Sequence, residues 1–375
     1  MVAGPRRDLE ASVWRGGGWK SAVTVLATSI CSACGQGDPD AAPAPDGTEL
    51  MPQPADVVEV NGVSLAYQSF GASERETVLL IAGAGMQAVE WPMALVEELV
   101  ERGYRVIRFD SRDVGRSTIH SEAGLPDSMA IRRALEEGMP APLPYDFHDL
   151  AADAVGLLDA LEIPAAHIVG ISMGGAIAQL IAIDRPDRTL SLTLLMSDSG
   201  NPALPIPRPE AFVGLPIQPT SEGEDAFVEW QVATWRALAG SAYPEDEEML
   251  RNRARRVFAR GFDPDALTRH QTVSLVGHLE TAEHRRENLE QIEVPTVVLH
   301  GAEDPLVDVA AARELADRIP NADLRIIDGL GHELPLQLAS VFADAITDAA
   351  DAVPPHPGPS ATTATLPPPR ALPRS

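Results

Sequence analysis

Cysteine is almost missing from this sequence. Only Cys31 and Cys34 occur among the 375 residues, and both precede the part of the chain that carries strand and helix patterns. That part therefore has no thiol for nucleophilic attack, no thiolate metal ligand and no disulfide. The shortage excludes a cysteine nucleophile and a thiolate metal site, and we expect neither a metal nor another cofactor.

Positive charge is also scarce. Lys20 is the only lysine, and 29 Lys and Arg residues against 55 Asp and Glu residues give a net charge of -26. Such a surface repels phosphate groups, so we expect no nucleic-acid partner and no binding to an anionic membrane by the surface alone. The 45% of hydrophobic residues supplies enough apolar material for one large core.

The apolar run near the N-terminus, residues 21–30, is too short to span a bilayer. It follows several basic residues and precedes small residues and Cys34, which is typical of an export signal. The pattern resembles a bacterial lipoprotein signal with Cys34 as the lipidated residue, although Cys31 stands where leucine is usual. We expect residues 1–34 to be a leader and the protein to be exported and lipid-anchored. The alternative is a disordered leader on a cytoplasmic enzyme.

Composition divides the rest of the chain. Residues 35–54 are rich in Pro, Asp and Ala and are predicted to be a flexible linker, and residues 352–375 a disordered Pro-rich tail. Residues 55–351 form the predicted folded domain. Within it, residues 200–290 are expected to be a helical cap.

Strand and helix patterns alternate through the predicted domain. Asn61-Gly62 separates two strand-like runs, 56–60 and 63–70, as in a hairpin. Further strands are predicted at 77–82, 104–109, 166–171, 190–196, 294–300 and 322–327. Helices are predicted at 91–103, 147–161, 173–184, 226–238, 246–259, 309–319 and 335–350. This order predicts an α/β fold with a mainly parallel, doubly wound sheet.

The most informative motif is Gly-x-Ser-x-Gly at residues 170–174. An apolar strand precedes Ser172 and a helix of small residues follows it, which is the context of a nucleophile elbow. Glycines on either side permit a close backbone approach that a Cβ would block. We therefore predict that Ser172 is a nucleophile and that the N–H of Met173 stabilises the oxyanion.

A serine hydroxyl needs a base. His332 follows a predicted strand in a Gly-rich loop before the last helix, where α/β sites form. His270, His278 and His284 are interpreted as helix-surface residues. We predict His332 as the base.

The acid that orients this base is predicted to be Asp304, a few residues after a strand and followed by one helix and one strand before His332. Asp198, after another strand, is the alternative acid. The second oxyanion donor is predicted to be the N–H of Ala84, in the loop after residues 77–82. Residues 110–117 are interpreted as a structural turn held by internal ion pairs.

With these residues together, the chain resembles α/β hydrolases similar to aclacinomycin methylesterase. The resemblance rests on residues 108–117 and 149–155, the Ser172 elbow, and the loops of Asp304 and His332. It implies the α/β-hydrolase fold and hydrolysis of carboxylic esters, with methyl esters of polyketide-like compounds as one substrate class.

The leading hypothesis is therefore a cofactor-free serine hydrolase acting on a small-molecule ester or lactone. Two alternatives stay open. The same three residues could perform C–C bond hydrolysis, acyl transfer or perhydrolysis, and the fold could serve a non-catalytic ligand-binding protein.

Overall fold

The computed structural model describes residues 55–205 and 223–354. The predicted leader and linker, and the tail from residue 355, lie outside these ranges. Export and lipid attachment at Cys34 therefore stay predictions. Within the described ranges, no helix is long and apolar enough to cross a bilayer.

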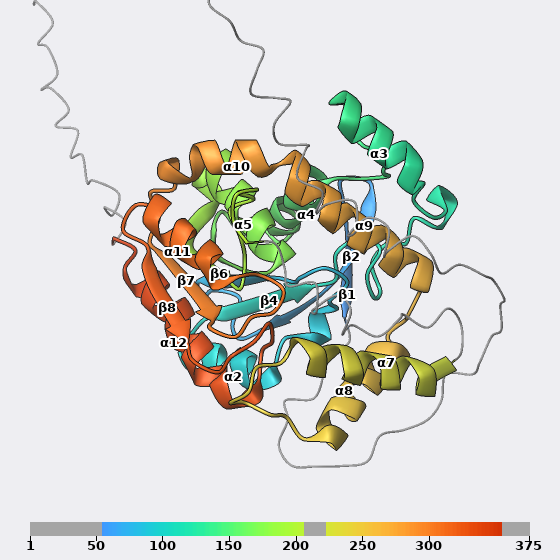
Figure 1. Cartoon of the computed structure of the whole chain (residues 1–375). Coiled ribbons are helices and arrows are strands. Elements are labelled where there is room, and N and C mark those ends of the chain that lie inside the picture. The colour runs from blue at the N-terminus through green and yellow to red at the C-terminus, as the bar shows by residue number, and fades with distance from the viewer. Residues whose placement is uncertain (1–54, 206–222, 355–375) are drawn as a thin grey trace, which may run out of the picture.

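In the described residues, eight strands form one mixed sheet in the order β1-β2-β4-β3-β5-β6-β7-β8 (Figure 1). Their bounds are β1 Asp56–Val60, β2 Val63–Phe70, β3 Thr77–Ile81, β4 Arg105–Phe109, β5 Ala166–Ile171, β6 Thr189–Leu195, β7 Thr296–Gly301 and β8 Asp323–Ile327. β2 runs antiparallel to both β1 and β4, and all the other neighbouring pairs are parallel. The predicted hairpin and the mainly parallel sheet are confirmed.

Helices cover both faces of the sheet. Those of the described residues are α2 Met93–Glu101, α3 Ser128–Glu137, α4 Phe147–Ala160, α5 Met173–Asp184, α7 Gly223–Leu238, α8 Glu247–Ala259, α9 Pro264–Glu280, α10 Ala282–Asn288, α11 Val309–Arg318 and α12 Ala339–Asp351. Each face has its own core: α4, α5 and α11 pack on one, α2 and α12 on the other. Because both faces are covered, β3, β5 and β7 are buried throughout, and their sequences are mainly apolar.

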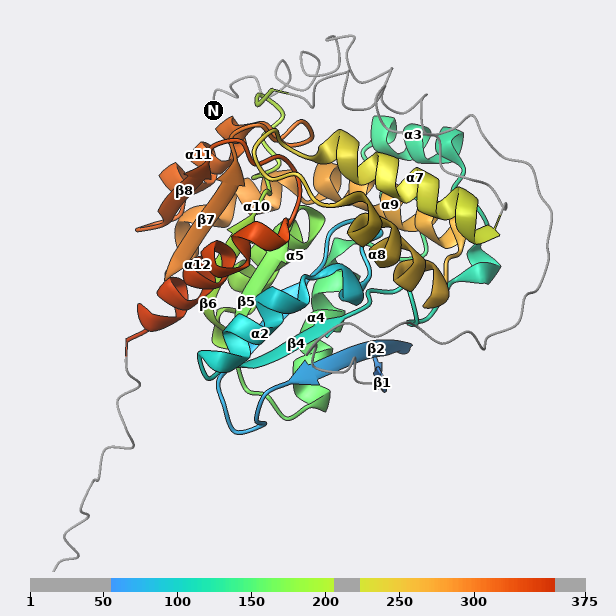
Figure 2. The ribbon, with the colours of Figure 1, turned by 90° about the horizontal axis from the view of Figure 1, so that it is seen from below.

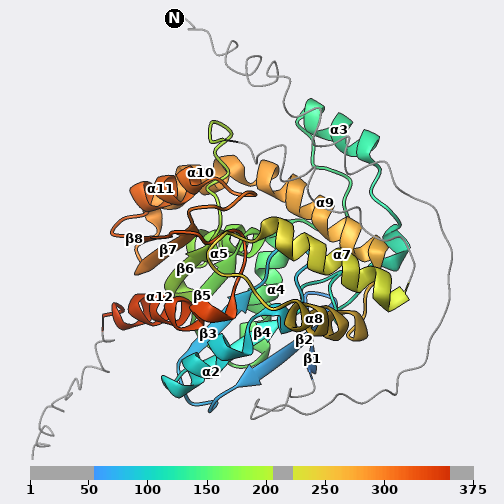
Figure 3. The same cartoon turned by 60° about the horizontal axis from the view of Figure 1, so that its bottom comes forward.

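Four helices, α7 to α10, lie between β6 and β7, in the segment expected to be a cap. α7 and α8 pack on each other beside the sheet around a small apolar cluster of their own (Figure 2). α9 and α10 return to the body, where α9 contacts α4 and α5, and α10 contacts α5. α3 projects from the body (Figure 3), and its only buried residue is Ile131.

Candidate active site

Ser172 occupies a strained turn between β5 and α5. Its backbone has φ 55° and ψ −121°, a region that residues with a Cβ rarely adopt. Hydrogen bonds to neighbouring segments hold the turn. The Ser172 N–H donates to the carbonyl of Leu195 at 2.9 Å, and the Ser197 hydroxyl donates to the carbonyl of Ser172 at 2.9 Å. The side chain of Ser172 is partly exposed, whereas its chain neighbours are buried.

The flanking glycines are required by close backbone contacts. A Cβ on Gly170 would overlap the carbonyl of Gly174, and a Cβ on Gly174 would overlap the carbonyl of Ile81. α5 therefore begins directly behind β5 and β3. The first helical residue is Met173, whose N–H has no carbonyl one turn earlier within the helix to pair with.

Asp304 and His332 meet across the loops that follow β7 and β8. His332 Nδ1 lies 2.7 Å from Asp304 Oδ2. The other carboxylate oxygen, Oδ1, accepts the N–H groups of Leu306 and Val307 at 2.8 Å each. β5, β7 and β8 run parallel, so the loop of Ser172 opens at the same edge of the sheet as these two loops.

The surroundings favour a charged Asp304 carboxylate. Burial raises its pKa, but His332, His300 and the Val307 N–H together outweigh burial and hold that pKa below its usual range. His300 is fully buried, and burial lowers its pKa. Its Nε2 donates to the carbonyl of Val307 at 2.8 Å and lies 3.4 Å from Asp304 Oδ2. The sequence alone does not indicate a role for His300, because a contact between a strand residue and the loop that follows produces no recognisable sequence motif.

The loop of Ala84 lies beside the serine. A Cβ added to Gly83 would lie 3.4 Å from the Cβ of Ser172, and Ala84 itself is exposed. Gly85 has φ 71°, and a Cβ there would overlap Leu267 of α9. The loop therefore runs between the serine and the segment that returns from the cap.

Asp198 belongs to a different ionic cluster from that of Asp304 and His332. Asp198 Oδ2 is 3.4 Å from His278 Nε2, and its Oδ1 is 3.7 Å from an Arg285 nitrogen and accepts the Gly200 N–H at 2.6 Å. Burial raises its pKa, but His278, Arg285 and the Gly200 N–H lower the pKa below its usual range overall. These contacts join the end of β6 to α9 and α10.

The helix-surface interpretation is wrong for His270. It is fully buried, and its Nδ1 lies 3.2 Å from the hydroxyl of Tyr145. Burial lowers the pKa of His270 to about 4, so the imidazole is neutral at physiological pH. His278 is partly buried, while His284 pairs with Asp184 at the surface.

The ion pairs of residues 110–117 are not internal to that turn, contrary to the sequence interpretation. They reach three other segments: Asp110–Arg260, Arg112–Asp153 and Asp113–Arg269. The turn after β4 therefore fastens α4 and the segment that returns from the cap to the body.

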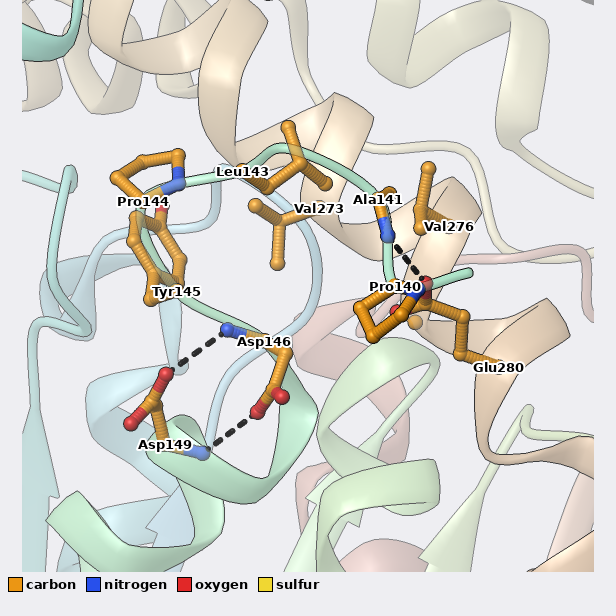
Figure 4. Close-up of a pocket in the computed structure, with 11 residues that line it drawn as sticks. Pro140, Ala141, Leu143, Pro144, Tyr145, Asp146, Asp149, Val273, Val276 and Glu280 are labelled. Carbon is orange, nitrogen blue, oxygen red and sulfur yellow. Dashed lines mark hydrogen bonds between the residues drawn. The ribbon is translucent and has the colours of Figure 1, made fainter. Parts of the chain in front are cut away.

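A cavity of about 210 Å³ lies apart from these groups, between residues 140–149 and α9 (Figure 4). Its carboxylates already accept backbone N–H groups. Asp146 and Asp149 cap the start of α4, and Glu280 binds the Ala141 N–H at 2.8 Å. Neither Ser172, Asp304 nor His332 lines it.

The comparisons with known proteins agree with this architecture. Residues 76–337 match the alpha/beta hydrolase fold family. Rhodomycin D methylesterase DnrP of Streptomyces peucetius is 32% identical, over 78% of this chain and 97% of that protein. A putative carbamate hydrolase, RutD of Variovorax paradoxus, is 29% identical over 76% of this chain and 95% of that protein.

Among solved structures, a meta-cleavage product hydrolase from Pseudomonas fluorescens superposes with a TM-score of 0.59 at 20% identity. The match covers 80% of this chain and 98% of that one. A likeness at this identity concerns the fold alone. The family match and the 32% identity across most of the chain show that this protein belongs to the α/β hydrolase fold family.

Proposed function

We propose that this protein is a serine hydrolase that cleaves a carboxylic ester or lactone of a small, mainly apolar molecule. The observation that carries the proposal is the 2.7 Å contact between His332 Nδ1 and Asp304 Oδ2 at the sheet edge where Ser172 sits in its strained turn. A nucleophile, a base and an orienting acid are the groups that acyl transfer requires.

In this mechanism Ser172 Oγ attacks the ester carbonyl, and Nε2 of His332 takes the hydroxyl proton. The alkoxide of the ester leaves with that proton and the acyl group stays on Ser172. Water then attacks the acyl-enzyme, with His332 again accepting and returning a proton. Asp304 accepts the Nδ1–H, which holds the ring in the required tautomer and stabilises the imidazolium without taking the proton.

The negative charge on the tetrahedral intermediate needs donors that are already in place. We assign the N–H of Met173 and the N–H of Ala84 to this role. Met173 is the first residue of α5, where N–H groups lack intrahelical partners. Ala84 follows Gly83, where an added Cβ would lie 3.4 Å from the Cβ of Ser172.

The proposed substrate class comes from the relatives. A protein 32% identical over 97% of its own length is named a rhodomycin D methylesterase. We therefore propose methyl esters of bulky, polycyclic molecules as the first class to test. Such a substrate leaves methanol, a small alcohol that needs no pocket of its own.

The test combines active-site labelling with a substrate panel. A fluorophosphonate should label wild type at Ser172 and leave Ser172→Ala unlabelled, and a panel of bulky methyl esters, simple alkyl esters and lactones should show turnover. Labelling of Ser172 without turnover of any ester or lactone would overturn ester hydrolysis and favour C–C cleavage or acyl transfer. Absence of labelling in folded wild type would favour a non-catalytic binder.

A further inference from the structure

The segment between α7 and α8, residues 239–246, contacts the loop of His332 directly. The His332 N–H donates to the carbonyl of Leu238 at 2.8 Å, and the Gly240 N–H donates to Glu333 Oε1 at 2.8 Å. The Ala242 N–H donates to the carbonyl of Gly329 at 3.1 Å. Three hydrogen bonds therefore join this loop to the cap segment and its flanking helix end.

The same segment also contacts the loop of Asp304. Ser241 donates to the Glu303 carboxylate twice, from its N–H and from its hydroxyl, at 2.8 Å each. Glu303 is the residue before Asp304, and its own N–H donates to the carbonyl of Leu330 at 2.9 Å. The acid loop is thus bonded both to the cap segment and to the base loop.

Glycines make this contact close. A Cβ on Gly240 would overlap the carbonyl of Gly329, and a Cβ on Gly331 would overlap the carbonyl of Leu238. A Cβ on Gly301 would overlap the carbonyl of Leu330. The three backbone segments therefore touch with no side chain between them, so a shift of one is transmitted to the others.

The far end of the segment is fixed to the cap helices. Glu245 pairs with Arg253 of α8 at 3.0 Å, and the Arg253 guanidinium lies 4.0 Å from the ring centre of Trp235 on α7. Burial raises the pKa of Glu333, and the Glu245 carboxylate raises it further. Residues 239–246 are therefore anchored at one end to the cap and at the other to the two loops.

We propose that residues 239–246 are a positioning clamp that sets the loops of Asp304 and His332 relative to each other, with Gly240, Ser241 and Glu303 as its positioning residues. This inference rests on the proposed function of Ser172, Asp304 and His332. The clamp touches neither substrate nor reacting atoms and acts through the orientation of the imidazole. A misplacement of about 1 Å between reacting groups costs on the order of 10²-fold in rate.

The test compares graded variants of the clamp. Glu303→Ala removes both acceptors for Ser241, Ser241→Ala removes one donor, and Ser241→Thr keeps the hydroxyl. Gly240→Ala forces a Cβ against the base loop. Glu248→Gln, which removes an exposed charge on the neighbouring helix α8, is the control. Each variant is measured for kcat, KM, the pH profile of kcat/KM and the melting temperature.

We expect kcat to fall about 5- to 20-fold in Glu303→Ala and about 10- to 100-fold in Gly240→Ala, with KM changed less than about threefold. Ser241→Ala should lose less, Ser241→Thr should recover wild-type kcat, and Glu248→Gln should match wild type. The low-pH limb of the kcat/KM profile should shift in Glu303→Ala, because the imidazole environment changes.

A structural role alone would lower the melting temperature and leave kcat and the pH profile of the folded fraction unchanged. That result, in Glu303→Ala and Ser241→Ala alike, overturns the clamp. Should Gly240→Ala fail to fold, the two side-chain variants decide the matter. The proposed function is judged separately on wild type, because it fails if folded wild type hydrolyses no ester or lactone, whether or not Ser172 is labelled.

Discussion

Both carboxylate oxygens of Asp304 are engaged, one by His332 Nδ1 at 2.7 Å and the other by two backbone N–H groups of its own loop. The acid can therefore not rotate without losing hydrogen bonds, and the imidazole that it holds has one orientation. His300 adds a buried imidazole, whose Nε2 lies 3.4 Å from the same oxygen that His332 contacts. A fixed acid of this kind makes the roles of the three candidate residues separable by mutation.

Removal of the nucleophile or the base should abolish turnover while the fold survives. Ser172→Ala and His332→Ala should each lower kcat by at least about 10³-fold, because neither residue can be replaced by water in the first step. Steady-state hydrolysis of an ester substrate measures the loss, and circular dichroism checks the fold. Near-normal turnover by Ser172→Ala would move the nucleophile elsewhere.

The two candidate acids should respond differently to an amide substitution. Asp304→Asn should lower kcat by about 10²- to 10⁴-fold, because an amide stabilises the wrong tautomer of His332. Asp198→Asn should keep activity but lower the free energy of unfolding by about 1–3 kcal/mol, because the buried Arg285 loses its charged partner. Paired kinetics and urea unfolding of both variants make the comparison. An active Asp304→Asn with an inactive Asp198→Asn would reverse the assignment.

Glu90 should make stability fall as pH rises. Burial raises its pKa to about 7; the neighbouring Asp110 raises that pKa further, while Gln87 and Arg253 partly oppose the rise. The folded state therefore holds a proton that the unfolded state has lost, and the free energy of unfolding decreases between about pH 4.5 and pH 7. Glu90→Gln should raise the free energy of unfolding by about 1–3 kcal/mol at pH 8.

The difference in the free energy of unfolding between wild type and Glu90→Gln should vanish at pH 4, where the carboxyl is mostly protonated in both states. Urea unfolding of wild type and Glu90→Gln at both pH values gives the difference. Equal differences at pH 4 and pH 8 would mean that the carboxyl does not titrate between the two states.

The sequence offers three aromatic residues of the expected cap, Phe212, Trp230 and Trp235, as candidates for setting substrate preference or for packing the cap. Phe212 lies outside the described residues, so the two tryptophans carry the test. Trp230 packs against Phe227 at a ring distance of 5.7 Å, in the apolar cluster of α7 and α8. Trp230→Ala should lower the free energy of unfolding by about 1–3 kcal/mol. Trp235 lies at the end of α7 against Arg253, and Trp235→Leu should change relative kcat/KM values across an ester panel. Uniform losses over the panel would assign Trp235 to packing as well.

The localisation proposal from the sequence is tested with the full chain. Expressed in a bacterial host, wild type should partition with membranes and carry lipid mass on an N-terminal Cys34, because acylation of that residue requires export. Cys34→Ala should remove the lipid. Recovery of soluble, unprocessed wild type would contradict export and favour the alternative of a cytoplasmic enzyme.

The sequence predicts the sheet and the elbow well because their signals are local. β3, β5 and β7 are mainly apolar, and the glycines around Ser172 mark a turn in which a Cβ would overlap the backbone. The loops of Asp304 and His332 were found through their positions after strands. These are features that a short window of residues contains.

The sequence does not predict α3, the bounds and buried face of α9, or the contacts between distant segments. α3 buries only Ile131, so it has almost no apolar stripe. α9 buries Arg269 and His270 beside small residues, so its inward face is partly polar and its helical period is hidden. Gly240 and Gly329 are far apart in the chain but close together in the fold. A glycine carries no sequence signal that identifies the segment it contacts, so this approach cannot be predicted.

The ion pairs Asp110–Arg260 and Asp113–Arg269 fix the point at which the chain re-enters the body after α8. Both arginines follow α8, so these two ion pairs form a downstream attachment of α7 and α8 to the body. An exchange of the two helices would keep this attachment if it spared Arg260 and Arg269. It would also have to keep the hydrogen bonds of residues 238–242 to the loops of Asp304 and His332, so the helix pair is tied to the body at two places.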